Sequence, residues 1–384
     1  RKGKVAGASG AAAGSADDDS TAVSVSAAPG LENKTGQHSC FVNVVVQTLW
    51  NVSAFRDAFL VCEPHAEARG EDRSIFLAMK QVCSMMEDGA AAAVAADVSQ
   101  SKPQQATASA LKEALFQLDS SFELGEMHDA TEAHEALLEA LHRALAPPPV
   151  LAPPESQLGA GSSSDQGDAI SSSQENDGVS CSADSFVKNI FSMCMRMEYC
   201  RPTDPKEEHS KPVTFDQWTQ YVVASELRKH VREAEAGGAG SPLVRVLRMA
   251  AGCEPSLGDG KAQPAPGCNK MQMLRTPRVF TLGLASDTAH ASKAEISESL
   301  QGIDERLKLR DVYEGLVEDG GCDLVALTAF YEQHYVCFCF SHTAGQWIHY
   351  DDDTRRLLGK DFDSVKEKCI AGRLHPQLLF YEAH

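Results

Sequence analysis

A long hydrophobic run is missing from this sequence. None of its stretches approaches the roughly 18 consecutive apolar residues that a membrane helix requires, and the basic start, RKGK, is not followed by the apolar segment of a secretory signal. We therefore expect no membrane partner and a reducing compartment, the cytoplasm or the nucleus. In such a compartment the 12 cysteines are better interpreted as buried thiols, metal ligands or a nucleophile than as disulfides. An initiator methionine is also missing, which favours a fragment of a longer chain.

Positive charge is scarce as well. The 384 residues include 35 Lys and Arg against 54 Asp and Glu, which gives a formal net charge of -19. A nucleic-acid-binding surface needs clustered positive charge to release counterions from phosphates, so we expect no nucleic-acid partner. Hydrophobic residues make up 43% and charged residues 23% of the chain, which is typical of a globular protein. The acidity is compatible with a basic protein partner but does not identify one.

Large apolar side chains are almost absent from two segments. Residues 1–29 consist mainly of Ala, Gly, Ser and Asp, and residues 146–184 contain the runs APPPVLAPPESQ and GSSSDQGDAISSSQENDG. Such segments cannot bury enough surface to offset the entropy of ordering them. We therefore expect a disordered N-terminal segment and a flexible insertion. The sequence has no internal repeat.

Helical patterns precede strand patterns along the chain. Residues 41–60, 107–118 and 131–145 look helical, and residues 131–145 space their leucines at helical intervals. From Arg278 onward the runs VFTLGL, LVALTAFY, HYVCFCF, QWIHY and PQLLFYE are typical of strands. Helices followed by strands favour an α+β fold over alternating βαβ units.

Cys40 is a candidate nucleophile. A polar turn precedes it, and the apolar run that follows carries Asn43 and Gln47 on one helical face. At the first turn of a helix, unpaired backbone N–H groups and the helix dipole stabilise a thiolate and can receive a developing oxyanion. Two other interpretations stay open: an ordinary buried thiol, and a strand formed by the valines that follow.

His334 is the candidate base. HYVCFCF, the turn SHTAG and QWIHY predict a hairpin in which His334 and residues 351–353, three aspartates, lie side by side. A carboxylate orients an imidazole and stabilises its cation, as the partner base of a thiol requires. The alternative is an edge hairpin with a solvated acidic end, and nothing in the sequence requires Cys40 to meet His334.

Three segments resemble motifs of the ubiquitin-specific protease family, in the family's order. Residues 30–49 are similar to its cysteine box, and residues 334–352 are similar to its histidine box. Residues 128–142 are similar to its QDAxEFLxxLLDxLH helix. The matching residues are Gly30, Leu31, Asn33, Cys40, Phe41, Asn43, Gln47 and Leu49; His334, Tyr335, Trp347, Tyr350, Asp351 and Asp352; and Asp129, Ala130, Glu132, Leu138 and Leu141. The resemblance is strongest to the divergent branch numbered fifty-three and fifty-four in vertebrates.

The resemblance implies a papain-like cysteine protease fold with thumb, palm and fingers over residues 30–384. The expected parts are a thumb at 30–145, the insertion at 146–184, fingers at 185–280 and a palm at 281–384. It also implies hydrolysis of the isopeptide or peptide bond after the C-terminal glycine of ubiquitin, with ubiquitin and ubiquitinated proteins as partners.

The resemblance also implies roles for single residues. Cys40 corresponds to the nucleophile, His334 to the general base and Asp351 to the carboxylate that orients it. Asp352 corresponds to a position that can assist at the same site. Asp129 corresponds to an acid near the cleft that contacts the ubiquitin tail.

The sequence departs from the family's pattern beside the nucleophile and beside the base. The family carries an oxyanion-binding asparagine five residues before the cysteine, where this chain has Thr35. The oxyanion donor is therefore Asn33, Gln37 or backbone N–H groups alone, and losing one such donor costs about 2.7–4 kcal/mol of barrier. Gln333 replaces the glycine before the base and is expected to narrow the channel for the tail.

Zinc is a further departure. Family members often carry two CxxC knuckles in the fingers, and this sequence contains no CxxC. Four cysteines with stretched spacing could still form a tetrahedral site, although a degenerate site is favoured; they are Cys194, Cys200, Cys253 and Cys268. We expect that no cofactor is required.

Two further functional hypotheses stay open beside the active deubiquitinase. The altered oxyanion turn and Gln333 favour a catalytically silent ubiquitin-binding scaffold. A papain-like protease with unrelated substrates would share the chemistry but would not explain the match at residues 128–142.

Overall fold

Eight segments of the chain are described by the computed structural model. They are residues 29–34, 36–95, 106–146, 185–199, 212–252, 269–286, 290–316 and 321–384. The predicted disordered segment 1–29 and the predicted insertion 146–184 lie outside these residues except at Pro29 and Ala146. None of the helices in these segments has the length and apolar character that a membrane span needs.

Helix α1 (Cys40–Asn51) is the centre of the N-terminal helical layer. Every side chain from Cys40 to Trp50 is buried because the helix packs against both α5 (Ala130–Leu145) and strand β10 (His334–Ser341). Burial on all sides explains why its apolar residues follow no simple period, and tertiary packing overrides the strand preference of its valines. The predicted helix 41–60 is two helices, because the extended residue Val52 separates α1 from α2 (Ser53–Val61).

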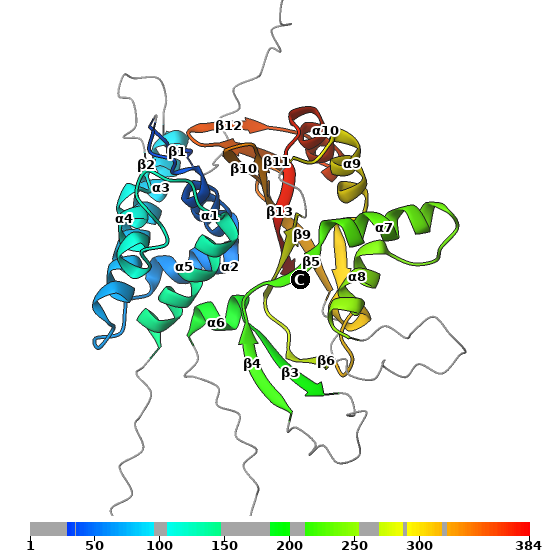
Figure 1. Ribbon diagram of the computed structural model, residues 1–384. Helices are drawn as coiled ribbons and strands as arrows, with labels where there is room; N and C mark the ends of the chain where they lie inside the picture. Colours follow the sequence, from blue (N-terminus) through cyan, green and yellow to red (C-terminus); the bar gives the residue numbers. More distant parts are fainter. Residues whose placement is uncertain are drawn as a thin grey trace, which may run out of the picture.

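The rest of this layer consists of α3 and α4, with a short pair of strands beside them. Helix α3 (Gly70–Ala95) was not predicted, although Ile75, Met79, Val82 and Met86 are buried at helical spacing. Helix α4 (Ser109–Leu118) confirms the predicted helix at 107–118 and packs against α3 and α5. Strands β1 (Leu31–Glu32) and β2 (Ala106–Thr107) pair in parallel. Figure 1 shows these blue and cyan helices on one side of the large sheet.

The large sheet has eight strands and carries the predicted C-terminal strands. Its order is β12-β11-β10-β9-β13-β7-β5, with β8 paired to β9. All of its pairs are antiparallel except β5 with β7. The remaining bounds are β5 Gln220–Val223, β7 Val279–Ala285, β8 Arg306–Lys308, β9 Gly321–Tyr331, β11 Gln346–Asp351, β12 Thr354–Leu357 and β13 His375–Ala383.

Helices cover both faces of this sheet. Along β10, Tyr335 and Cys337 pack into the core shared with the N-terminal helices, whereas Val336 and Phe338 pack into a second core. This alternation follows from the two-residue period of a strand. The second core lies under α7, α8, α9 and α10, whose bounds are Ala224–Glu235, Pro242–Ala250, Lys293–Gln301 and Phe362–Gly372; the short 3-10 helix η1 is Leu309–Asp311.

A separate three-stranded antiparallel sheet projects beside the large one (Figure 1). It consists of β3 (Met193–Tyr199), β4 (Val213–Gln217) and β6 (Asn269–Arg275) in the order β4-β3-β6, and α6 (Phe186–Phe191) precedes it. The fingers were expected over residues 185–280. Within that range these three strands form the small sheet, whereas β5 joins the large sheet and α7 and α8 pack on it.

Candidate active site

Cys40 is the first residue of α1. Its side chain is 2% exposed, and its Sγ atom lies 3.9 Å from Sδ of Met127. The carbonyl oxygen of Ser39 accepts the first hydrogen bonds of the helix, from Val42 and Asn43. The backbone N–H groups of Cys40 and Phe41 therefore have no acceptor among the described residues. The thiol thus lies beside the unpaired N–H groups of a helix N-terminus, as the sequence predicted.

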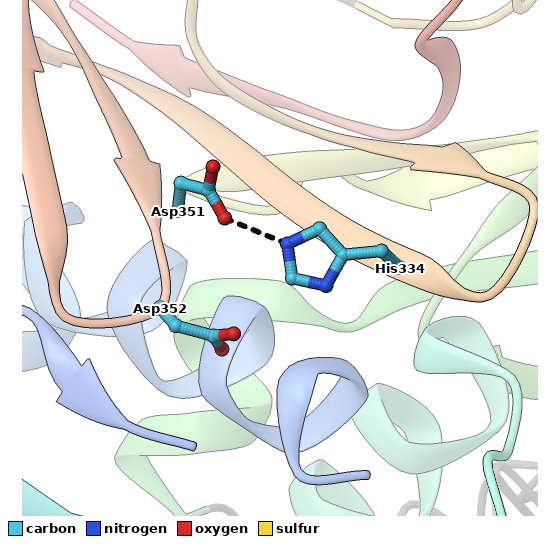
Figure 2. Close-up of side chains that lie close together, drawn as sticks. All are labelled: His334, Asp351 and Asp352. Atoms are coloured by element: carbon cyan, nitrogen blue, oxygen red, sulfur yellow. Dashed lines mark hydrogen bonds and ion pairs between the residues drawn. The ribbon is translucent and has the colours of Figure 1, made fainter. Parts of the chain in front are cut away.

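The predicted hairpin brings His334 and Asp351 together. Strands β10 and β11 pair from Cys337 with Tyr350 to Ser341 with Gln346, and this register places the start of β10 beside the end of β11. Nε2 of His334 and Oδ1 of Asp351 are 2.6 Å apart, and the dashed line in Figure 2 marks this hydrogen bond. Because Asp351 occupies Nε2, Nδ1 is the ring nitrogen that remains for a thiol.

The neighbours of His334 favour its cationic form. The hydrogen bond with Asp351 and the nearby Cys40 sulfur, whose anionic form attracts the cation, raise the pKa of His334 to about 10, although burial opposes the shift. The same bond to His334 lowers the pKa of Asp351. The structure therefore brings Cys40, His334 and Asp351 into one cluster, which the sequence did not require.

Asp352 connects this hairpin to α1 and β1. Its carboxylate accepts hydrogen bonds from Nδ2 of Asn33 and Nδ2 of Asn43, both at 2.9 Å. Its backbone oxygen accepts from Nε2 of Gln47 and from the N–H of Leu31, also at 2.9 Å. Asn43 and Gln47 thus share a helical face as predicted. The carboxylate lies beside His334 (Figure 2), but both of its oxygens are already bonded to amides.

Gly30 allows β1 to lie against this hairpin. A Cβ atom at Gly30 would lie 2.4 Å from the carbonyl carbon of Asp353, closer than any side chain can come to backbone. The residue is therefore glycine because another backbone occupies the space of its side chain. This close approach places the segment that carries Asn33 next to Asp352.

The two oxyanion candidates, Asn33 and Gln37, hold the turn before Cys40. Oδ1 of Asn33 accepts the N–H of Ser39 at 3.0 Å while its Nδ2 is bonded to Asp352. Oε1 of Gln37 accepts the N–H of Lys34 at 3.3 Å. Thr35 lies outside the described residues. Both amide oxygens thus accept backbone N–H groups of the turn. The free N–H groups at the start of α1 are the third candidate for the oxyanion donor.

Lys112 is a residue of this site that the sequence analysis missed. It lies on α4 and is 5% exposed, and its Nζ donates hydrogen bonds to the carbonyl oxygens of Gln37 and His38. The only signal was a lysine between Leu111 and Ala114 on the buried face of a predicted helix. Nothing in the local sequence connects it to a turn about 75 residues away.

The two residues expected to contact the substrate tail lie on exposed turns. Asp129 caps α5, and its Oδ1 accepts the N–H of Thr131 at 2.6 Å. Gln333 lies in the two-residue turn between β9 and β10, next to Glu332, whose φ is 52°. Their contact with a substrate stays a prediction.

One group of described residues has the composition of a metal site. Ligand atoms of His334, Asp351 and Asp352 lie within 4.8 Å of one another (Figure 2). Hydrogen bonds within the protein already engage the atoms concerned, so we interpret the group as part of the Cys40 cluster. Of the four cysteines considered for zinc, Cys194 is buried on β3, and the other three lie outside the described residues. The zinc expectation therefore stays a prediction.

Comparison with known proteins places this arrangement in a family. The sequence profile described as "Ubiquitin carboxyl-terminal hydrolase" matches residues 29–381. The chain is 26% identical over 372 residues to "Ubiquitin carboxyl-terminal hydrolase 54" of Mus musculus, covering 94% of this chain and 21% of that protein. It is 26% identical over 370 residues to "Ubiquitin carboxyl-terminal hydrolase 53" of Homo sapiens, covering 94% and 30%. The chain thus spans about a fifth to a third of the length of these relatives.

Solved structures share the fold. The SAGA DUB module of Ubp8, Sgf11, Sus1 and Sgf73 bound to monoubiquitin gives a TM-score of 0.54 at 12% identity, covering 93% of this chain and 69% of that chain. A second structure of the SAGA Ubp8, Sgf11, Sus1 and Sgf73 DUB module gives a TM-score of 0.53 at 15% identity, covering 93% of this chain and 67% of that chain. These likenesses show an α+β ubiquitin-specific protease fold, as predicted. With a family profile that matches residues 29–381, the chain belongs to the ubiquitin carboxyl-terminal hydrolase family.

Proposed function

We propose that this protein is a cysteine-type deubiquitinase, which hydrolyses isopeptide or peptide bonds after the C-terminal glycine of ubiquitin. One observation carries the proposal: His334 lies between the carboxylate of Asp351 and the thiol of Cys40 at the N-terminus of α1. A nucleophile, a base and an orienting acid are the groups that thiol-dependent hydrolysis requires. Membership of the family supports ubiquitin as the substrate.

The proposed reaction uses these three residues in turn. Nδ1 of His334 takes the thiol proton of Cys40, and Asp351 stabilises the imidazolium through Nε2. The thiolate attacks the carbonyl carbon of the terminal glycine, and the oxyanion binds to free N–H groups at the start of α1. His334 then gives its proton to the leaving amine. A water molecule, deprotonated by His334, hydrolyses the thioester and releases ubiquitin.

We also propose the conditions under which this chemistry operates. No cofactor is required, because the thiol, imidazole and carboxylate supply every proton transfer. Any zinc held by the cysteines of the fingers would have a structural role. A reducing compartment, the cytoplasm or nucleus, suits a thiol nucleophile, and the cysteines among the described residues are all free. The partners are ubiquitin and ubiquitinated proteins.

A catalytically silent ubiquitin-binding scaffold is the second candidate. It is favoured by Asn33, whose amide holds Ser39 and Asp352 instead of lying free beside the thiol. Gln333, in place of the family's glycine, adds a side chain next to the base.

The test is reaction with ubiquitin that carries a C-terminal electrophile. Wild type and Cys40→Ala are incubated with this probe, and Cys62→Ala, which removes a half-buried free thiol at the C-terminal end of α2, is the matched control. The deubiquitinase proposal expects a covalent adduct for wild type and the control, none for Cys40→Ala, and release of a fluorophore coupled to ubiquitin. If ubiquitin binds wild type without an adduct, the scaffold is supported. If it neither binds nor reacts, both candidates are wrong.

A further inference from the structure

Lys112 is a buried cation without a carboxylate partner in the described part of the chain. Its Nζ donates to the carbonyl oxygens of Gln37 and of His38, the latter at 3.0 Å, and lies 5.3 Å from the centre of the Phe41 ring. Burial lowers the pKa of Lys112, and the nearby Cys40 thiol opposes that shift. A buried charge without a counter-ion is unfavourable unless its surroundings compensate it, so its position calls for an explanation.

The two carbonyl groups that Lys112 binds belong to the turn before the nucleophile. This turn contains two residues in the left-handed region, Gly36 at φ 81° and His38 at φ 47°, so it does not follow a regular conformation. In a trans peptide the C=O and the following N–H point in opposite directions. Lys112 therefore directs the N–H groups of His38 and Ser39 away from α4. The side chain of Asn33 accepts the N–H group of Ser39, whereas the N–H group of His38 has no acceptor among the described residues.

We infer that Lys112 is a positioning residue for the reaction of Cys40: it fixes the turn that orients the oxyanion donors and places a buried positive charge beside the thiolate. This inference rests on the proposed function. Lys112 contacts the turn from the side of α4, and Asn33 holds it from the side of the hairpin. The turn, which replaces the family's asparagine-containing one, is therefore held at both sides.

Lys80 offers a matched control. Its Nζ donates to the carbonyl oxygens of Phe59, Leu60 and Cys62 at 2.7–2.8 Å and lies near the rings of Phe59 and Phe76. It therefore performs the same structural task as Lys112 at the end of α2, away from the nucleophile. Replacing it removes a lysine that holds carbonyl groups but leaves the charge around Cys40 unchanged.

The experiment compares Lys112→Met, Lys112→Gln and Lys112→Arg with Lys80→Met in the full chain. The rate at which iodoacetamide alkylates Cys40 is measured against pH by mass spectrometry of the Cys40 peptide. Turnover of ubiquitin coupled to a fluorophore gives kcat and KM, and Kd for ubiquitin is measured separately. The other ionisable groups around the thiol and its helical turn include His38, His128, His334, Tyr335, Asp351 and Asp352, and none of them is substituted.

The inference predicts that Lys112→Met moves the midpoint of alkylation to higher pH. It should lower kcat by up to about 100-fold, because oxyanion donors lose their orientation, with KM and Kd unchanged. Lys112→Arg should restore most of kcat. Lys80→Met should lower Tm but leave the alkylation profile and kcat at the wild-type values.

Three results would overturn the inference. They are a wild-type alkylation profile and kcat in a folded Lys112→Met, an equal loss of kcat in Lys80→Met, and failure of both neutral Lys112 variants to fold. The last would make Lys112 a folding residue only. The proposed function fails separately. If Lys112→Met changes the alkylation of Cys40 but wild type never reacts with ubiquitin, the deubiquitinase proposal is wrong and the effect of Lys112 on Cys40 remains.

Discussion

At the scale of single residues, His334 combines two neighbours that both favour its cation. The bond to Asp351 and the Cys40 thiol raise its pKa to about 10 from an ordinary value near 6.5. A raised pKa means that the folded state binds the proton more tightly than the unfolded chain does. The stabilisation is therefore fully present below about pH 6.5 and is lost as the pH rises through about 10. The side chains of His334 and Asp351 are 40% and 46% exposed, so solvent and salt weaken this stabilisation.

Asp351→Asn tests this arrangement. Without the carboxylate the pKa of His334 should fall towards its ordinary value, so an NMR titration of the imidazole should move from about 10 to a lower pH. Turnover should fall by about 10²–10⁴-fold, because the base is no longer oriented. An unchanged titration in the folded variant would show that Asp351 does not control His334.

His134 is a buried residue whose pKa moves in the opposite direction from that of His334. Neither ring nitrogen has a hydrogen-bond partner among the described residues, and the ring packs edge-on against Phe380 and Phe191 at 5.2 and 6.1 Å between centres. Burial lowers its pKa to about 3. The folded protein therefore holds His134 neutral, and stability that is present above about pH 6.5 is lost as the pH falls towards 3.

His134→Phe should stabilise the protein. It removes an unpaired buried polar group, which costs about 1–3 kcal/mol, although the larger ring offsets part of the gain. The free energy of unfolding, measured in urea, should rise most at low pH, so the difference between variant and wild type should grow from pH 7 to pH 5. A difference that does not depend on pH would contradict the assignment of His134 as a neutral buried base.

At the scale of secondary-structure elements, Asp352 joins three segments that are distant in sequence. Its carboxylate and backbone oxygen accept hydrogen bonds from the segment around β1 and from the first turns of α1. The residue itself lies in the turn between β11 and β12. The residue adopts φ 51°, which Asn and Asp tolerate better than most side chains. This turn therefore contributes, together with the packing of α1 on β10, to the position of the nucleophile relative to its base.

Asp352→Ala should lower both stability and activity. The variant loses two hydrogen bonds to a charged acceptor, each worth about 1.5–3 kcal/mol, and leaves Asn33 and Asn43 without this partner. Because Asp352 is half-buried and solvent replaces part of this bonding, we expect a loss of about 2–4 kcal/mol in urea unfolding and slower adduct formation with the ubiquitin probe. Asp352→Asn, which keeps one acceptor oxygen and the tolerance for positive φ, should be milder. Equal stability of wild type and Asp352→Ala would contradict this role.

At the scale of the whole molecule, the site lies between two layers that different parts of the chain supply. The N-terminal helices provide Cys40 and Lys112, and the large sheet provides His334 and Asp351 (Figure 1). The α5 helix ends just before residues 147–184, which lie outside the described residues, and the chain is described again from Ser185. Nδ1 of His142 and Oγ of Ser185 are 2.8 Å apart, so the chain returns close to the helix that it left.

Replacing residues 150–181 with a short Gly-Ser linker should therefore preserve the fold and the site. The His142–Ser185 contact shows that a short connection can close the gap, and a segment with the composition predicted for an insertion would contribute little beyond its closure entropy. Tm should change little, and the ubiquitin probe should react at the wild-type rate. A large drop in Tm would show that the segment packs against the domain.

The sequence alone determined the local structure around Cys40 and His334 and the chemical types at the site. The hairpin that carries His334 and Asp351 was predictable because its strands alternate with period two around a polar turn. The helix start at Cys40 and the shared face of Asn43 and Gln47 were predictable because helical spacing is local. Family motifs then indicated ubiquitin chemistry, and the family profile confirms the family.

Only the tertiary structure decided how these pieces meet. The contact of Cys40 with His334, the binding of Asp352 to α1 and β1, and the reach of Lys112 to the turn at Gln37 and His38 all join residues tens to hundreds of positions apart. No spacing rule specifies such contacts, because they depend on how two helical layers pack on one sheet. The break at Val52, whose extended backbone separates α1 from α2, was not predicted either.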